Sequence, residues 1–222
     1  MLSILLPIIY AAFISLGLPD SVLGSAWPTI YPEFGVPVSY AGIVSAIISV
    51  GTVISSLLSA RLISVLKTGG VTAISVAMTA AALYGFSLCH NFWALCLWAV
   101  PYGLGAGSVD AALNNYVAIH YKSHHMSWLH CMWGIGATLG PYIMGHVLSQ
   151  GMPWNMGYRM LSFFQLALVI ALGLWLYVVN YINTTHEQTL YNVPVGLEGK
   201  SILTADRGFM LLSEDDYRVN IT

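Results

Sequence analysis

The chain has 222 residues, of which 57% are hydrophobic and only 7% are charged. Soluble domains usually carry about 25% charged residues, so this composition excludes an ordinary soluble fold and indicates several membrane-spanning segments. The net charge is −2, and no cluster of Lys and Arg marks a surface for nucleic acid, so no nucleic-acid partner is expected. Three cysteines without a regular spacing argue against structural disulfides.

Six apolar segments are long enough to cross a bilayer core about 30 Å thick. They run near 2–31, 38–60, 70–88, 92–119, 127–149 and 160–181. Pro19 lies within the first segment and predicts a bend or local unwinding there. We therefore expect residues 1–182 to form a transmembrane bundle. Residues 183–222 are polar and are expected to form a cytoplasmic tail or interdomain loop with little order.

Basic residues predict the orientation of the segments in the membrane. With the N-terminus in the cytoplasm, the inside loops hold Arg61, Lys67 and Lys122, whereas the outside loops hold only Arg159. The tail adds three further basic residues on the inside, Lys200, Arg207 and Arg218. This distribution predicts that both termini lie in the cytoplasm. We expect an integral protein of the plasma membrane, in bacteria of the inner membrane.

A weak internal repeat relates the two halves of the predicted bundle. The first and fourth segments each carry a single Asp after a stretch that contains glycine. The second and fifth segments can be overlaid so that Gly51 meets Gly136 and Arg61 meets His146. The sequence thus predicts an all-α polytopic membrane protein of six transmembrane helices, arranged as a 3+3 inverted repeat.

The two acids inside the predicted spans are Asp20 and Asp110. A charged group is costly in hydrocarbon, so each carboxyl should face a protein interior or a water-filled cavity. Burial favours the protonated form of a carboxyl and brings proton exchange toward working pH, so the acids are candidates for proton coupling, and Asp20 also for substrate binding. The alternative is a structural acid that bonds to neighbouring polar groups.

Polar residues near these acids are candidate substrate ligands. Asn114 follows Asp110 by one helical turn and shares its face, while Asn115 points about 100° away. His130 and Trp133 share a face of the fifth segment, and an aromatic plane beside hydrogen-bonding groups is a common way to hold a sugar. Three of these residues also have a structural alternative. Asn114 could bond to a neighbouring helix, the buried imidazole of His130 could have its hydrogen bonds met within the protein, and Trp133 could serve packing.

Enzyme and metal functions are not expected. Ser108 follows a glycine-rich run, but Val109 stands where an intramembrane serine protease would need glycine. His120, His124 and His125 flank a predicted loop without a neighbouring acid or cysteine, which argues against a metal site. No cofactor is expected.

Three motifs resemble transporters of the major facilitator superfamily, and in particular the fucose permease-like sugar:proton symporter branch. They are GLPDSVLGSAWP in the first segment, GxGxxDxxxN in the fourth and LHxxxGxGATLGP in the fifth. The resemblance covers about residues 1–182 and implies that Asp20 and Asp110 are the substrate- and proton-linked acids. It also places the helix-five sugar-binding positions on His130 and Trp133, which replace the amides of the sugar permease and leave the substrate open.

The loop between the second and third segments, SARLISVLKTGG, stands where the family carries a gating motif. Ser64 replaces an acid of that motif, and Arg61 and Lys67 remain as the predicted gating residues. The family fold has twelve helices with the substrate site between two halves, whereas this chain supplies six. We therefore expect a fragment or truncated product, or a chain that pairs with a second half or with itself.

The sequence as a whole predicts proton-coupled uptake of a small sugar by alternating access. Asp110 would carry the proton, and Asp20, Asn114 and His130 would line the site. The expected partners are a sugar-like solute, protons and the lipid bilayer. Two alternatives remain open, an exporter of drugs or metabolites with the same fold and a transport-incompetent membrane protein that acts only as an interaction partner.

Overall fold

The computed structural model describes residues 2–191, 200–205 and 208–213, with side-chain exposure described for 5–171 and 173–174. The chain divides into two parts, Met1–Leu174 and Trp175–Thr222, each of which is described by itself. The helices in chain order are α1 (Leu2–Asp20), α2 (Val22–Glu33), the 3₁₀ turn η1 (Val38–Tyr40), α3 (Ala41–Ser87), α4 (Phe92–His120), α5 (Ser123–Ser149) and α6 (Trp154–Tyr191).

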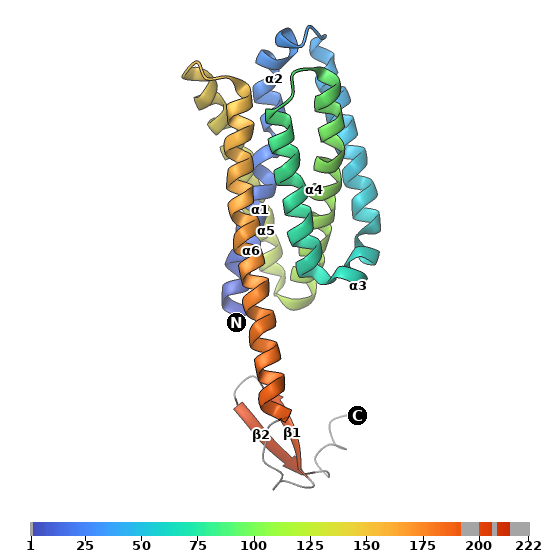
Figure 1. The fold of residues 1–222 in the computed structure, drawn as a ribbon, viewed down its shortest axis with the longest axis vertical. Helices are drawn as coiled ribbons and strands as arrows, with labels where there is room; N and C mark the ends of the chain where they lie inside the picture. Colours follow the sequence, from blue (N-terminus) through green and yellow to red (C-terminus); the bar gives the residue numbers. More distant parts are fainter. Residues whose placement is uncertain (1, 192–199, 206–207, 214–222) are drawn as a thin grey trace. The chain divides into compact units, whose positions relative to one another are not determined.

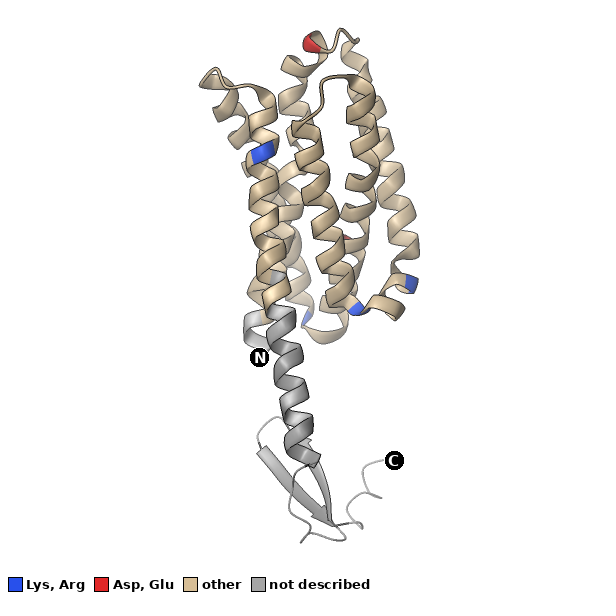
Figure 2. Ribbon diagram, viewed as in Figure 1, with Lys and Arg blue, Asp and Glu red and all other residues tan. Residues whose placement is uncertain are grey.

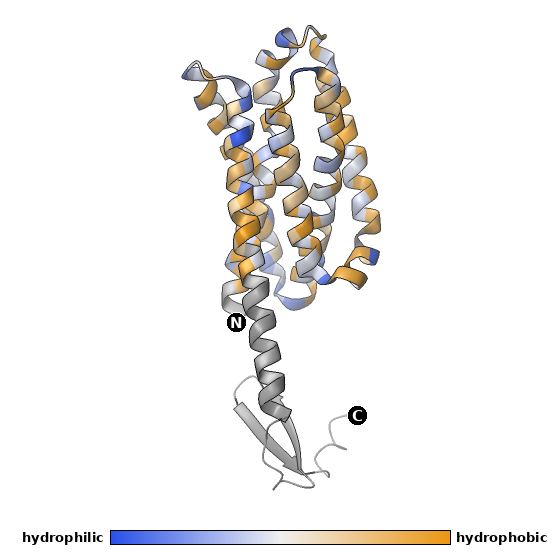
Figure 3. Ribbon diagram, viewed as in Figure 1, coloured by the Kyte–Doolittle hydropathy of each residue, from blue (hydrophilic) through white to orange (hydrophobic). Residues whose placement is uncertain are grey.

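α1 and α2 follow one another in the same direction, α3 turns back on itself, and the long helical runs of the first part lie side by side (Figure 1). Hydrophobic residues lie along their lengths, and hydrophilic residues are more frequent at their ends and connections (Figure 3). Because a helix satisfies its backbone hydrogen bonds internally, such long apolar segments can sit in lipid. The predicted all-helical, membrane-spanning class is confirmed for this part of the chain.

The first predicted segment is interrupted where the sequence places a proline. α1 ends at Asp20, directly after Pro19, and α2 begins at Val22. α2 then continues to Glu33, through two further prolines, beyond the boundary expected from the sequence. The interruption leaves Asp20 at a helix end partway along the predicted first span.

The second and third predicted segments form one helical run, α3, of 47 residues. The separate loop expected between them is absent, because both helices extend up to a sharp kink at Lys67. This residue has φ 59° and ψ 163°, a backbone conformation that is uncommon outside glycine. The chain reverses direction at this kink (Figure 1).

Three described stretches are long and apolar enough to cross a membrane, Leu5–Glu33, Val38–Ser87 and Phe92–His120. The second has 50 residues and contains the kink, so its length suffices for two crossings. Helices α5 and α6 lie where the sequence predicts the fifth and sixth spans. The arrangement of six spans as two inverted triplets stays a prediction.

Helix packing depends on glycine at two interfaces. α3 packs along α4, and α1 packs along α5. A Cβ atom added to Gly103 of α4 would collide with the backbone of Ile48 in α3. A Cβ atom added to Gly136 of α5 would likewise collide with the carbonyl oxygen of Ile14 in α1. Small residues thus bring both pairs of backbones into contact.

Helix α6 is held against the bundle by polar contacts. Ser162 Oγ donates a 3.0 Å hydrogen bond to the carbonyl oxygen of Ala80 in α3. Gln165 Nε2 donates a 2.8 Å hydrogen bond to the carbonyl oxygen of Ser15 in α1. At the start of α6, Trp154 donates to a carboxylate oxygen of Glu33 at 2.6 Å.

The second part contains the end of α6 and a β-hairpin. Strand β1 (Lys200–Ala205) pairs antiparallel with β2 (Gly208–Ser213), in a register that sets Lys200 opposite Ser213. The sequence interpretation expected little order across 183–222. It underestimated the helix, which continues to Tyr191, and the short apolar runs that favour strands. Two of the tail's basic residues, Arg207 and Arg218, lie outside the described residues.

Candidate functional site

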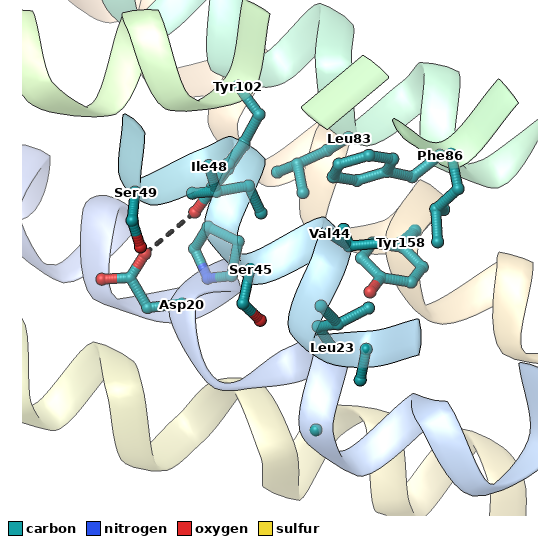
Figure 4. A pocket seen from close by; sticks show the side chains of 14 residues that line it. Asp20, Leu23, Val44, Ser45, Ile48, Ser49, Leu83, Phe86, Tyr102 and Tyr158 are labelled. Atoms are coloured by element: carbon teal, nitrogen blue, oxygen red, sulfur yellow. Dashed lines mark hydrogen bonds between the residues drawn. The ribbon is translucent and has the colours of Figure 1, made fainter. Parts of the chain in front are cut away.

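Asp20 is held by two side chains from different helices. Tyr102 of α4 donates its phenol hydrogen to Oδ1 at 2.9 Å, and Trp133 of α5 donates its indole hydrogen to Oδ2 at 2.8 Å. Each carboxylate oxygen therefore has a donor, and Figure 4 shows the bond from Tyr102. The carboxylate is fixed in place by neutral donors.

A cavity of about 380 Å³ opens beside Asp20. Its lining comes from α1, α3, α4 and α5, and comprises Leu16, Asp20, Ile48, Thr52, Ala106, Asp110, His130 and Trp133. The structure thus brings together four residues that the sequence predicts for the site, although they lie on three different helices. None of the lining residues is Lys or Arg. The cavity combines two carboxyl groups, an imidazole and an indole.

A second cavity, of about 240 Å³, adjoins the same acid. Asp20 and Ile48 line both cavities, and the second also contains the hydroxyl groups of Tyr102 and Tyr158 (Figure 4). Asp20 is therefore the acid that the two spaces share.

Close contact of α1 and α5 sets the position of Trp133. A Cβ atom on Gly17 would collide with the carbonyl oxygen of Trp133. Gly17 lies three residues before Asp20, so the same contact brings the indole within reach of the carboxylate. On the same helix, His130 packs edge-on against Phe13, with ring centroids 6.3 Å apart.

Asp110 is partnered by the residue one turn along α4. Asn114 Nδ2 donates a 3.0 Å hydrogen bond to Asp110 Oδ1, as the spacing predicts for a shared face. The Oδ1 atom of Asn114 is buried and has no hydrogen-bond partner among the described residues. Neither Asn114 nor Asn115 is among the residues that line the two cavities, so a role of either in substrate binding stays a prediction, and the link of Asn114 to the larger cavity is its hydrogen bond to Asp110.

The predicted gating residues lie apart from the cavities. Arg61 and Lys67 are exposed, and Ser64 donates a 2.7 Å hydrogen bond to the carbonyl oxygen of Arg61. Among the coloured residues of Figure 2, Lys and Arg gather mostly at the end of the bundle where the chain begins. No described group of three His, Cys, Asp or Glu side chains could hold a metal ion.

Two residues that contact the α1 break were not predicted from the sequence, Tyr102 and Gln165. Tyr102 lies between Pro101 and Gly103 in an apolar run, where a phenol is the only hint of a polar partner. Gln165 is an isolated amide in the sixth segment. In both cases a polar residue inside a span was the available signal.

The fold and the site define a polytopic helical membrane protein with acid-lined cavities between its helices. Residues 9–211 match the family model described as Major Facilitator Superfamily, and the chain belongs to this family. Its members are membrane transporters of small-molecule solutes rather than enzymes. No curated protein matches the chain.

Proposed function

We propose that the chain is one six-helix half of a symporter that couples proton entry to uptake of a small sugar by alternating access. The observation that carries this proposal is the shared cavity of Asp20, Asp110, His130 and Trp133. Carboxylates and imidazole can bond to sugar hydroxyl groups, and the indole offers an apolar face. The same carboxyl groups can take up and release a proton.

The two acids have different surroundings, which supports different roles. Both oxygens of Asp20 accept hydrogen bonds from protein donors, so its carboxylate has a fixed orientation suited to a substrate hydroxyl. Asp110 has one side-chain donor, Asn114, and lines only the larger cavity. We assign Asp110 as the proton carrier and Asp20, with His130 and Trp133, to the substrate.

The packing supports the proposed 3+3 inverted repeat. Gly17 of α1 meets the carbonyl oxygen of Trp133, and Gly103 of α4 meets that of Ile48. The overlay of the second and fifth segments expected from the sequence also sets Ile48 on Trp133. The two contacts thus join corresponding pairs of segments, the first with the fifth and the fourth with the second, as an internal two-fold relation requires.

A second bundle would complete the transport site. Asp20, Asp110 and His130 are exposed in this structure although they lie in apolar segments, and such groups avoid lipid. We propose that a second six-helix unit, in a longer chain or in another copy, covers this face. The basic residues Arg61 and Lys67 support a cytoplasmic location for the α3 kink, with both termini on that side of a plasma membrane.

Sugar binding tests this proposal. The full chain in lipid nanodiscs is titrated with a panel of neutral monosaccharides by calorimetry. We expect saturable binding of at least one sugar, and a loss of roughly tenfold or more in affinity for Asp20→Asn, because a hydrogen bond to a charged group contributes about 1.5–3 kcal/mol. Ser64→Ala, at the distant kink, should bind normally. A folded chain that binds no neutral sugar, or binds organic cations instead, would overturn the sugar assignment.

A further inference from the structure

Pro19 removes one hydrogen bond from the backbone of α1. In a helix, each N–H donates to the carbonyl oxygen four residues earlier, and proline has no N–H to donate. The carbonyl that loses its donor at Pro19 is that of Ser15. Ser15 is 1% exposed, so water has little access to its carbonyl oxygen and does not readily supply the missing hydrogen bond. A freed carbonyl in a membrane helix needs another donor, and a side chain of a neighbouring helix can supply it.

Gln165 of α6 supplies that partner. Its Nε2 atom lies 2.8 Å from the carbonyl oxygen of Ser15, and the Gln165 side chain is itself 1% exposed. The amide oxygen of Gln165 is buried without a hydrogen-bond partner among the described residues. Burial of an amide whose oxygen has no hydrogen-bond partner is unfavourable. If this position served only to pack α6 against the bundle, an apolar side chain of similar size would be more favourable than glutamine. The position therefore favours a donor.

We infer that Gln165 is a positioning residue for Asp20, because it caps the carbonyl that Pro19 leaves without a donor and so holds the end of α1 in its bent form. Asp20 is the residue after Pro19, and in this geometry its carboxylate accepts hydrogen bonds from Trp133 and Tyr102. The cap thus links α6 to the acid without touching it. The link to transport rests on the proposed function, whereas the cap rests on the contacts alone.

Ser162, one turn earlier on α6, provides a matched comparison. Its hydroxyl also donates to a buried backbone carbonyl, that of Ala80, at 3.0 Å. The residue four positions after Ala80 is Tyr84, which has its own N–H, so the Ala80 carbonyl keeps its helix donor. Loss of the Ser162 bond removes an α6 contact of the same kind but frees no carbonyl.

A double-mutant cycle tests the cap. Thermal unfolding of the full chain in nanodiscs is followed for Gln165→Leu, Pro19→Ala and the double variant, and for Ser162→Ala with and without Pro19→Ala. Alanine at position 19 restores an N–H for Ser15, so we expect Gln165→Leu to lower the Tm clearly in the parent and much less in the Pro19→Ala background. Ser162→Ala should cost the same in both backgrounds. An equal Tm loss for Gln165→Leu in both backgrounds would overturn the cap.

The effect on Asp20 is read from the indole N–H of Trp133. Ultraviolet resonance Raman spectra report hydrogen bonding at this group. For each protein, the spectrum of the same protein with Trp133→Phe is subtracted, and the difference is the signal of Trp133. We expect Gln165→Leu to weaken this bond and Ser162→Ala to leave it unchanged. An unchanged Trp133 signal in Gln165→Leu would overturn the positioning role.

Neither measurement requires a substrate, so both remain informative if sugar binding fails. If Gln165→Leu does not fold, the cap predicts that Pro19→Ala restores a folded chain. Failure of the double variant to fold, while Pro19→Ala alone folds, would contradict the inference.

Discussion

The indole of Trp133 donates a 2.8 Å hydrogen bond to Asp20, although 113 positions separate the two residues in the chain. The bond joins α5 to the break in α1, at the point where Gly17 brings the two backbones together. One bend and one glycine contact therefore produce the arrangement around the acid. The site depends on helix packing as much as on the polar residues themselves.

Two glycines on the same helix should respond differently to alanine. A Cβ atom on Gly136 would collide with the backbone of α1, whereas one on Gly134 would meet nothing within 4 Å. We expect Gly136→Ala to destabilise the folded chain by about 1–3 kcal/mol through overpacking. Gly134→Ala should be neutral or slightly stabilising because alanine favours helix. Thermal unfolding compares them, and equal Tm values for the two variants would contradict the packing described for α1 and α5.

The bond between Glu33 and Trp154 should couple α2 to α6. Trp154 is 2% exposed, and its indole donates to the carboxylate at 2.6 Å. Glu33 is exposed, so we expect a modest coupling of roughly 1 kcal/mol in a double-mutant cycle of Glu33→Ala and Trp154→Phe, measured by unfolding. Trp128→Phe, at an exposed tryptophan on α5, is the control and should show no coupling with Glu33→Ala. Additive effects of Glu33→Ala and Trp154→Phe would show that the bond does not form in solution.

Stability should fall on the acid side of neutral pH because of His125, near the start of α5. Loss of solvent around the imidazole lowers the pKa of His125 from its usual 6.5, and the charges of His124 and Lys122 lower it further. Well above pH 6.5 the imidazole is neutral in both the folded and the unfolded state, and the full stability is present. As pH falls toward the lowered pKa, the unfolded chain binds more protons and folding weakens.

His125→Gln isolates this contribution. Unfolding of the parent and the variant is compared at several values between roughly pH 5 and pH 8, the range in which histidine titrates. We expect the parent to lose more stability than the variant as the pH drops. The Nδ1 atom of His125 lies 2.8 Å from the Tyr10 hydroxyl, which also ties this change to α1. Parallel curves for the two proteins would rule out His125 as the source.

The proposed orientation predicts which ends of the helices face the cytoplasm. Single cysteines are introduced as Ser64→Cys near the α3 kink and Ser149→Cys at the end of α5, after replacement of Cys89, Cys96 and Cys131. A membrane-impermeant maleimide applied to intact cells should label only Ser149→Cys. Inverted vesicles should give the opposite pattern, and labelling of Ser64→Cys in intact cells would reverse the topology.

The sequence was informative where a rare residue type stands in an apolar run. Asp20, Asp110 and His130 attract attention because ionisable groups are costly in lipid, and all three line one cavity. Tyr102 and Gln165 could not be assigned in this way. Their partners lie 82 and 150 positions away in the chain, so their roles depend on which helices touch.

Backbone details also escaped prediction. The positive φ of Lys67 lets α3 reverse without a separate loop. A lysine does not indicate such a conformation, and the glycines that would indicate it stand nearby at 69 and 70. The hairpin of β1 and β2 lies in a stretch whose overall polarity suggested little order. In both places local composition described the average of the segment and missed a short structural element within it.

The most direct test of the central claim is proton movement driven by sugar in proteoliposomes that contain the full chain. We expect at least one neutral sugar to raise the external pH, and Asp110→Asn to abolish this change. Glu33→Gln, at an acid outside both cavities, should retain it. A folded chain that moves no protons with any sugar would contradict transport by this chain alone or by paired copies of it. An Asp110→Asn variant that moves protons as the parent does would contradict the assignment of Asp110 as the proton carrier.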